Sequence, residues 1–339
     1  MRKIVECVPN FSEGRNAGTI KAIAESIHGV EGVKLLNVEP DKDYNRVVVT
    51  FVGEPEGVVE AAFQSTKVAA RLIDMQHHKG EHPRIGATDV VPFIPVTGVS
   101  MEDCVRLAKI YGERVASELL IPIYLYEAAA TSPGRRNLAD IRKGEYEGLV
   151  EKLRDPRWKP DYGDEVFNRK SGATVTGARK FLIAYNVNLD TADVSIAQEI
   201  ATRIRESGRV KKDAARITLR NEHGETLKIP GTLKAVKAMG VLVERLNIVQ
   251  VSINLVDYEI TPPHVAFEEV RKQAESLGVH VTGSEIVGLT PLNAILQAGR
   301  YYDSHETSEE RLISLVVERL GLSQLDNFDP LKKVIEYQL

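Results

Sequence analysis

The pattern of apolar and polar positions in the first hundred residues alternates between the periods of helices and of strands. Apolar residues at i, i+3, i+4 and i+7 predict a helix face from Ile20 to Ile27, with Asn16 as its N-cap. A second helix face follows Pro55. Stretches rich in β-branched residues predict strands at 2–10, 33–38, 45–53 and 87–96. The order strand, helix, strand, strand, helix, strand is that of a ferredoxin-like unit.

The second half repeats this order. Helix faces run from Ala197 to Ile204 and from Phe267 to Leu277, and 231–240 has a helical or mixed pattern. Strands are predicted at 179–189, 215–223, 247–257 and 279–289. We therefore predict an α/β (α+β) protein with two tandem ferredoxin-like subdomains. Each would have a mixed or antiparallel sheet with helices on one face.

The predicted domains are 1–178 and 179–339, the second including a C-terminal helical extension. Between the repeats, the pattern predicts a helix capped by Ser100 and a strand at 121–129. A single helix is expected over 137–153, and 154–163, with two prolines and a glycine, is the best linker. Thr290 is predicted to cap a helix that begins at Pro291, and an amphipathic helix follows at Leu312–Leu320.

Composition narrows the class of protein. The 44 basic and 48 acidic residues give a net charge of −4, which gives no reason to expect nucleic-acid binding. Neither a signal peptide nor an apolar run of about 18 residues is found, so we expect a cytoplasmic protein with no membrane segment. Cys7 and Cys104 are too few for a disulfide framework or a thiolate metal site.

The sequence "HKGEH", His78 to His82, carries the most suggestive chemistry. It matches the H-x-x-E-H pattern of a zinc hydrolase, which needs both histidines on one helix. Gly80 and Pro83 disfavour that helix, so zinc is the weaker interpretation. A histidine near its ordinary pKa of about 6.5 could instead serve as general acid and base. Local sequence favours a solvated loop for His77 and His78, and leaves His82 equally compatible with a loop and with catalysis.

Other polar residues stand beside predicted strands. Lys79, Arg84 and Arg46 could hold a carboxylate. Asn10 lies at the exit of the first strand, and Glu39 begins a polar turn whose simplest explanation is solvation. No glycine-rich phosphate loop is present in the sequence.

Several long stretches stand out together, among them "VECVPNFSEGRN", "HKGEHPRIGATDVVPFIPV", "IRKGEYEGLVEKL" and "GATVTGARKFLIAYNVNL". In this order they resemble the glutamate formiminotransferase family, the transferase part of the animal formiminotransferase-cyclodeaminase. The resemblance runs from residue 3 nearly to the end and is loosest at 208–233, where an insertion is expected. It implies two subdomains that enclose a ligand tunnel, a homodimer, and no cyclodeaminase activity.

The resemblance also implies the reaction: transfer of a formimino group from N-formimino-L-glutamate to N5 of tetrahydrofolate, in histidine degradation. The family's catalytic histidine corresponds to His82, and its folate-contacting segment to 163–172. Within that segment we expect contacts from Gly163, Asp164, Phe167 and Gly172. Tetrahydrofolate, with or without a polyglutamate tail, would be a cosubstrate, and no metal would be needed.

We hypothesise that His82 moves the proton, with Glu39 or Asn10 orienting it or the amidine. Three alternatives remain. A glutamate formyltransferase acting on N-formylglutamate or 5-formyltetrahydrofolate would use the same tetrahedral chemistry. A zinc hydrolase on "HKGEH" and a non-catalytic folate binder are the others.

Overall fold

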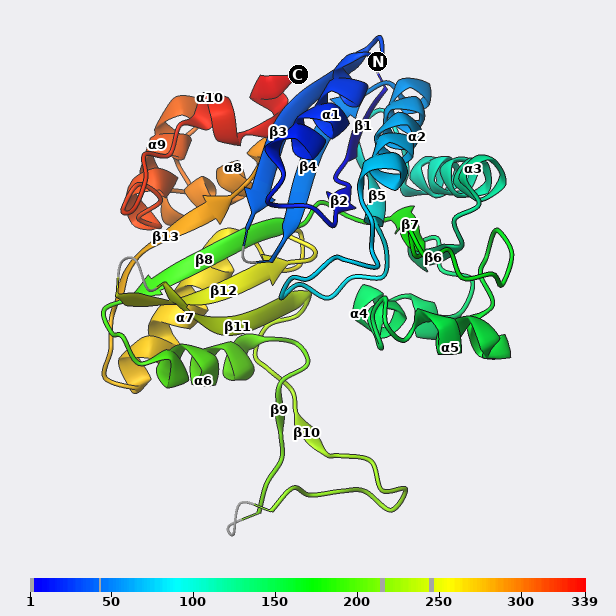
Figure 1. Cartoon of the computed structure of the whole chain (residues 1–339). Helices are drawn as coiled ribbons and strands as arrows, with labels where there is room; N and C mark the ends of the chain where they lie inside the picture. The colour runs from blue at the N-terminus through cyan, green and yellow to red at the C-terminus, as the bar shows by residue number, and fades with distance from the viewer. Residues whose placement is uncertain (1–2, 43, 214–216, 244–246) are drawn as a thin grey trace. The chain divides into compact units, whose positions relative to one another are not determined.

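The computed structural model describes residues 3–42, 44–213, 217–243 and 247–339. The chain divides into two compact units, Met1–Lys180 and Phe181–Leu339, each with its own hydrophobic core. Both units contain the predicted mixture of helices and sheets (Figure 1). The α/β class with two tandem subdomains is therefore confirmed.

The first unit is built on a seven-stranded sheet. Its strands are β1 (Ile4–Cys7), β2 (Asn10–Phe11), β3 (Val33–Asp41), β4 (Arg46–Gly53), β5 (Thr88–Thr97), β6 (Ile123–Glu127) and β7 (Thr174–Ala178). Strands β1 and β2 both lie between β4 and β5, and β3 pairs with the other edge of β4, all antiparallel. This is the strand order of a ferredoxin-like unit. Strands β7 and β6 extend the sheet by parallel pairing beyond β5.

Helices cover both faces of this sheet. The helices of the first unit are α1 (Ala17–His28), α2 (Pro55–Leu72), α3 (Met101–Leu119), α4 (Leu138–Arg142) and α5 (Leu149–Arg154), with 3-10 turns η1 (Pro133–Arg135) and η2 (Pro156–Trp158). Helices α1 to α3 share a core with Val47, Val49 and Val91. Residues of α4 and α5 pack instead with Val90 and Tyr124, whose side chains point to the opposite face. We predicted helices on one face of the sheet only. This holds for α1 to α3, whereas α4 and α5 lie on the other face.

The single helix predicted over 137–153 is wrong, because the chain turns between α4 and α5. Gly144 has φ +86°, a left-handed conformation that ends α4, and Gly148 approaches the Gly144 backbone. The turn carries Glu145 and Glu147, and the Tyr146 amide donates to the carbonyl of Arg84. The broken helix thus presents two carboxylates to the loop that contains His82.

The linker predicted at 154–163 is also wrong, since this stretch lies inside the first unit. Asp161 accepts hydrogen bonds from the Arg135 guanidinium at 2.7 Å and from the Leu125 amide at 2.8 Å. Tyr162 forms a bridge with Ile123 of β6. The prolines and the glycine therefore form turns inside the first unit rather than a linker. The boundary between the two units falls after Lys180.

The second unit has a four-stranded antiparallel sheet in the order β11-β12-β8-β13, again that of a ferredoxin-like unit. Its strands are β8 (Ile183–Leu189), β11 (Val236–Val243), β12 (Ile248–Leu255) and β13 (Val281–Val287), and a short hairpin is formed by β9 (Arg209–Val210) and β10 (Lys228–Ile229). Its helices are α6 (Val194–Ile204), α7 (Pro263–Ser276), α8 (Leu292–Tyr302), α9 (Glu309–Arg319), α10 (Pro330–Lys333) and the 3-10 turn η4 (Ile335–Gln338). Apolar side chains of α6 to α9 share one core with the sheet.

Three local predictions in this unit need correction. The stretch 231–240, expected to be helical or mixed, enters strand β11 at Val236. The strand predicted at 215–223 lies partly outside the described residues, and from Ile217 onward it forms only isolated bridges. Pro291, rather than Thr290, precedes α8, while the Thr290 amide donates to the carbonyl of Lys333. No helix in the described ranges is long and apolar enough to cross a bilayer.

Candidate active site

The loop 75–86, which carries His82, is fastened to three distant parts of the first unit. The Met75 amide donates to the carbonyl of Lys170, and Gly86 bridges Gly172. The Asn45 amide group donates to the carbonyl of Lys79 at 2.9 Å, and its Oδ1 accepts from the Gly14 amide. Gly80 is required where the loop passes Tyr44, because a Cβ there would lie 2.3 Å from the Tyr44 carbonyl oxygen. The loop is therefore held in one conformation.

His82 contacts Arg46 at the start of β4. Nη1 of Arg46 lies 2.8 Å from Nε2 of His82 and 3.2 Å from Oδ1 of Asn10. A guanidinium has only donors, so Nε2 of His82 accepts and the proton of the neutral ring is on Nδ1. The Tyr44 ring meets the imidazole edge-on with centroids 6.0 Å apart. The structure thus brings together His82, Asn10 and Arg46, three of the residues singled out in the sequence.

The surroundings keep His82 uncharged. Burial, with the positive charges of Arg46 and Arg142, lowers its pKa to about 4. We had expected a value near 6.5, but local sequence could not reveal two arginines brought in by folding. Burial also lowers the pKa of Arg46, with a further contribution from Arg142. The ring is therefore neutral at pH 7 and the guanidinium keeps its charge.

Arg84, also predicted to hold a substrate carboxylate, is bound within the protein. Its Nη1 and Nη2 form ion pairs with Glu145 at 2.7 Å and Glu147 at 2.6 Å. Its Nε donates to Nδ1 of His78, whose Nε2 donates to the carbonyl of Asn45. A substrate carboxylate would have to displace one of these partners from Arg84.

Sequence reasoning missed Asp89 and Arg142. Asp89 is buried in β5, accepts from the Ile85 amide at 2.9 Å and forms an ion pair with Arg142. An acid inside an apolar strand was a signal for Asp89, because such a charge is rarely buried without a partner. Arg142 had no such signal, since it is the last residue of the short helix α4, which the sequence pattern merged into a longer helix. The pair fixes the end of the His82 loop, and its two charges act on His82 in opposite directions, Arg142 lowering the pKa and Asp89 raising it.

The remaining candidates lie farther from His82. Glu39 stands opposite Val48 in β3, and Asn10 stands opposite Val48 from the other side, so both point to one sheet face. Two strand spacings separate them, roughly 10 Å, and Glu39 accepts from the Asn37 side chain at 2.7 Å. The side chain of Lys79 is exposed. No hydrogen bond among the described residues joins Glu39 or Lys79 to His82.

The loop geometry weighs against the zinc hydrolase. Residues 78–82 form no helix, and both ring nitrogens of His78 bond to groups of the protein. The pair of histidine ligands on one helical turn that this chemistry requires is therefore not formed. In the part of the chain that the structure describes, no three His, Cys, Asp or Glu residues gather as a metal would need.

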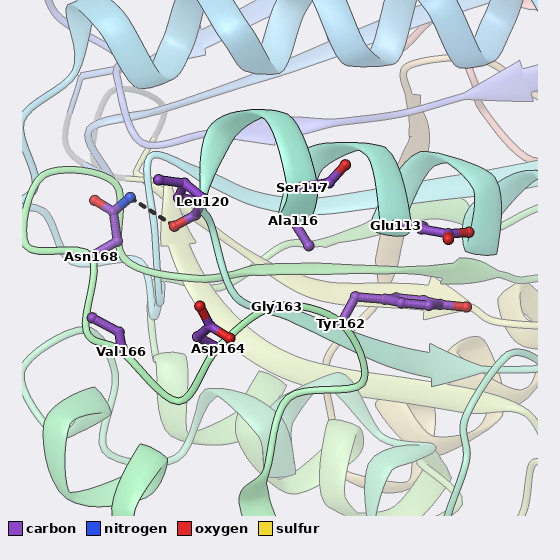
Figure 2. A pocket seen from close by; sticks show the side chains of 9 residues that line it. All are labelled: Glu113, Ala116, Ser117, Leu120, Tyr162, Gly163, Asp164, Val166 and Asn168. Atoms are coloured by element: carbon purple, nitrogen blue, oxygen red, sulfur yellow. Dashed lines mark hydrogen bonds between the residues drawn. The ribbon is translucent and has the colours of Figure 1, made fainter.

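The predicted folate segment, 163–172, runs from α3 to the His82 loop. Gly163 and Asp164 line a cavity of about 570 Å³ with the C-terminal half of α3. Figure 2 shows α3 on one side and this loop on the other, joined where the Asn168 side chain donates to the carbonyl of Leu120 at 3.2 Å. At the other end Gly172, with φ +67°, passes against the Ile85 carbonyl. Phe167 is half-buried and packs on Tyr146, with ring centroids 5.3 Å apart, against the edge of the core.

The comparisons with known proteins define the class. The sequence model of the formiminotransferase domain, N-terminal subdomain, matches residues 4–179, and that of the formiminotransferase domain matches 184–339. Together they cover nearly the whole chain, one for each repeat of the ferredoxin-like order. The chain belongs to the formiminotransferase family.

Particular relatives are of two lengths. The formimidoyltransferase-cyclodeaminase of mouse is 50% identical over 341 residues, which are 99% of this chain and 60% of the mouse protein. The chain thus spans about 60% of the length of such relatives. The glutamate formimidoyltransferase of Streptococcus pyogenes serotype M1 is 44% identical, covering 89% of this chain and 94% of its own. That of Thermoplasma acidophilum is 46% identical, covering 88% and 92%.

Proposed function

We propose that this protein transfers the formimino group of N-formimino-L-glutamate to N5 of tetrahydrofolate, giving 5-formiminotetrahydrofolate and glutamate. Family membership supports the reaction, and similar proteins bear the name glutamate formimidoyltransferase. One observation in the site carries the proposal: a neutral histidine with its lone pair on Nε2, flanked by Arg46 and Arg84. Arginines suit an anionic substrate, and a neutral imidazole suits proton transfer.

The chemistry assigned to His82 is a proton shuttle. N5 of the folate attacks the amidine carbon, forming a C–N bond and a tetrahedral adduct. His82 accepts the proton that leaves N5 and returns it to the glutamate nitrogen as the bond from that nitrogen to carbon breaks. Such a shuttle accelerates a reaction by about 10²- to 10⁴-fold, and alignment of two bound substrates supplies much of the rest.

The neighbours of His82 then have defined roles. Asn10 holds Arg46 through its Oδ1, and Arg46 is placed to bind a glutamate carboxylate. Segment 163–172 is proposed to contact the folate, with Asp164 in the cavity beside α3. The mechanism needs tetrahydrofolate as cosubstrate and assigns no step to a metal. Glu39 keeps the secondary role of orienting the amidine.

The donor is the least constrained part of the proposal, because an imine N–H and a carbonyl oxygen have the same shape. The test compares N-formiminoglutamate with N-formylglutamate as donors to tetrahydrofolate, following the one-carbon folate product by its absorbance. We expect turnover with the formimino donor at least about tenfold faster, a difference of 1.4 kcal/mol in the barrier. Faster turnover with the formyl donor would instead identify a glutamate formyltransferase. Tight folate binding without turnover of either donor would identify a non-catalytic folate binder.

We also propose a cytoplasmic homodimer, on the family resemblance alone. Light scattering after gel filtration should then give twice the 37.5 kDa of one chain. A mass of one chain at micromolar concentration would contradict the dimer.

A further inference from the structure

The hydrogen bond between Arg46 and His82 has a chemical consequence for a proton shuttle. Nε2 of His82 holds the lone pair, and Nη1 of Arg46 donates to it at 2.8 Å. The other ring nitrogen, Nδ1, carries the proton. A lone pair already bonded to a cation cannot accept a proton from a substrate. In this arrangement the base of the proposed reaction is therefore capped.

One donor beside this bond lacks an acceptor, and a second is poorly served. Nε of Arg46 is buried and has no hydrogen-bond partner among the described residues, and Nδ1 of His82 has only the Pro83 backbone nearby, without a bond of ordinary geometry. Arg46 and His82 also line one tight depression, together with Ser12, Tyr44 and Asp89, which has no room for a water molecule until a side chain moves. Buried donors without acceptors are rare, and they point to a ligand that accepts. A carboxylate offers the two oxygens that match the planar fork of Nε and Nη of an arginine.

We propose that Arg46 is a substrate-operated cap on His82: a carboxylate of the bound donor draws the Arg46 guanidinium from Nε2, and the freed imidazole then accepts the proton. The proposal rests on the proposed function and adds a coupling between binding and basicity. Arg46 is here a positioning and specificity residue. Before chemistry, Nη1 of Arg46 leaves Nε2 of His82, and its longer hydrogen bond to Oδ1 of Asn10 shifts with it.

The charges around His82 favour this coupling. Arg46 from β4 and Arg142 from α4 lower the pKa of His82, and Asp89 from β5 raises it. Tyr44 lies at the ring edge, and the neighbouring Arg84 is paired with Glu145 and Glu147. His78, whose own pKa is lowered by burial, is bonded to Arg84. A bound carboxylate adds negative charge beside Arg46, so it opposes the repulsion that keeps His82 unprotonated.

The coupling explains why a base would be stored in an inactive form. A molecule without a carboxylate, such as formamidine, cannot draw Arg46 away and so finds no free lone pair. A donor with glutamate carboxylates frees the base as it binds. Selectivity then appears in the proton-transfer step as well as in affinity.

The test follows the ring nitrogens of His82 by NMR in the full chain labelled with ¹⁵N-histidine, with the signal assigned by a His82→Gln variant. Glutarate serves as the probe, since it has both carboxylates and no transferable group. In the free protein we expect the Nδ1–H tautomer and a pKa of about 4. Saturating glutarate should move the Nε2 resonance and raise the pKa to about 5 or above. In Arg46→Gln the free protein should already show the higher value, and glutarate should no longer change it.

A Lys67→Gln variant on the exposed side of α2 is the matched control and should respond as the wild type does. The cap is disproved if glutarate saturates the wild-type protein, shown by calorimetry, while the His82 resonances and pKa stay unchanged. The wild-type titration suffices if Arg46→Gln does not fold. Because the readout needs no turnover, a response to glutarate without formimino transfer supports the cap and contradicts the proposed function. Formimino transfer by a protein whose His82 does not respond to glutarate supports the proposed function and contradicts the cap.

Discussion

His78 and His82, four residues apart in one loop, have opposite tautomers. Nε2 of His78 donates to the Asn45 carbonyl at 2.9 Å, while Nε2 of His82 accepts from Arg46 at 2.8 Å. The first ring has both nitrogens bonded inside the protein and acts as a brace. The second has its Nε2 lone pair turned to Arg46, and its Nδ1 has only the Pro83 backbone nearby, as far as the described residues show. The two residues that a zinc pattern would treat as equivalent ligands therefore have different roles.

Replacing His82 by Asn should remove the shuttle and leave the fold intact. We expect turnover at least about 100-fold lower, because the asparagine amide cannot accept a proton in place of Nε2 of His82. Folate binding should stay within a few-fold of wild type, measured by fluorescence titration. His77→Asn, at an exposed position of the same loop, is the control and should retain full activity. Near-normal turnover of His82→Asn would end the assignment.

Replacing Gly80 by Ala should disturb the site through the backbone. The added Cβ would lie 2.3 Å from the Tyr44 carbonyl oxygen, so the loop or the start of β4 must shift. We expect a loss of about 1–3 kcal/mol in unfolding free energy and a larger proportional loss of turnover. Gly134→Ala is the control, since no atom lies within 4 Å of its built Cβ. Equal behaviour of the two variants in urea unfolding would contradict this account of the loop.

Asp164→Ala tests the folate segment. Asp164 lines the cavity beside α3, so its loss should raise KM for tetrahydrofolate several-fold with little change in kcat. Glu151→Ala, an exposed residue of α5, is the control. If KM for folate is the same in both variants, this cavity is not part of the folate site.

His264→Phe should make the protein more resistant to acid. Burial lowers the pKa of His264 to about 4, below its ordinary 6.5, so the unfolded state binds the proton more readily. Unfolding free energy is therefore lost as pH falls from about 6.5 to about 4. Phenylalanine keeps the stacking on Tyr301, at 4.6 Å between centroids, and cannot titrate. We expect a gain of about 2 kcal/mol at pH 4 to 5 and little change at pH 7 to 8.

Urea unfolding at several pH values, followed by circular dichroism, measures this difference. His305→Gln, at an exposed position after α8, should follow the wild type. A pH-independent difference between His264→Phe and the wild type would show that His264 stays charged or accessible in the folded protein.

The sequence alone predicted the features that depend on local periodicity, namely the order of helices and strands and two helix N-caps. The structure contains the repeated strand and helix order and both of these N-caps, Asn16 and Ser100. The Ser100 side chain forms a capping box with Asp103. Helix 137–153 failed because Gly144 adopts a left-handed conformation that an apolar period does not register. Strand β11 was missed because the alternation in "VKAMGVLV" is weak and contains a glycine.

Within the site, sequence could find the histidine but not its surroundings. Asn10, Arg46 and His82 were singled out one by one, each from its place beside a strand. Their hydrogen bonds depend on β2 and β4 being neighbours and on a loop 36 residues farther along the chain. Arg142, the last residue of α4, and Glu147, in the turn that follows, reach the loop because the chain bends where the sequence pattern predicted one continuous helix. Long-range charge and burial, which set the pKa of His82, are therefore the part that required the structure.

The fastening of loop 75–86 also determines when the site can form as the chain folds. Asn45 lies 34 residues before its contact at Lys79, Glu147 lies 63 residues after Arg84, and Gly172 is later still. Contacts of such sequence separation form slowly, because each closes a long loop. During synthesis, the contacts of the loop with Asn45 and Arg46 can form soon after residue 82 has left the ribosome, whereas those with Glu145, Glu147 and Gly172 must wait for these residues. A chain stopped before residue 145 would contain His82 and Arg46 but would lack the ion pairs and the bridge that complete the attachment of the loop.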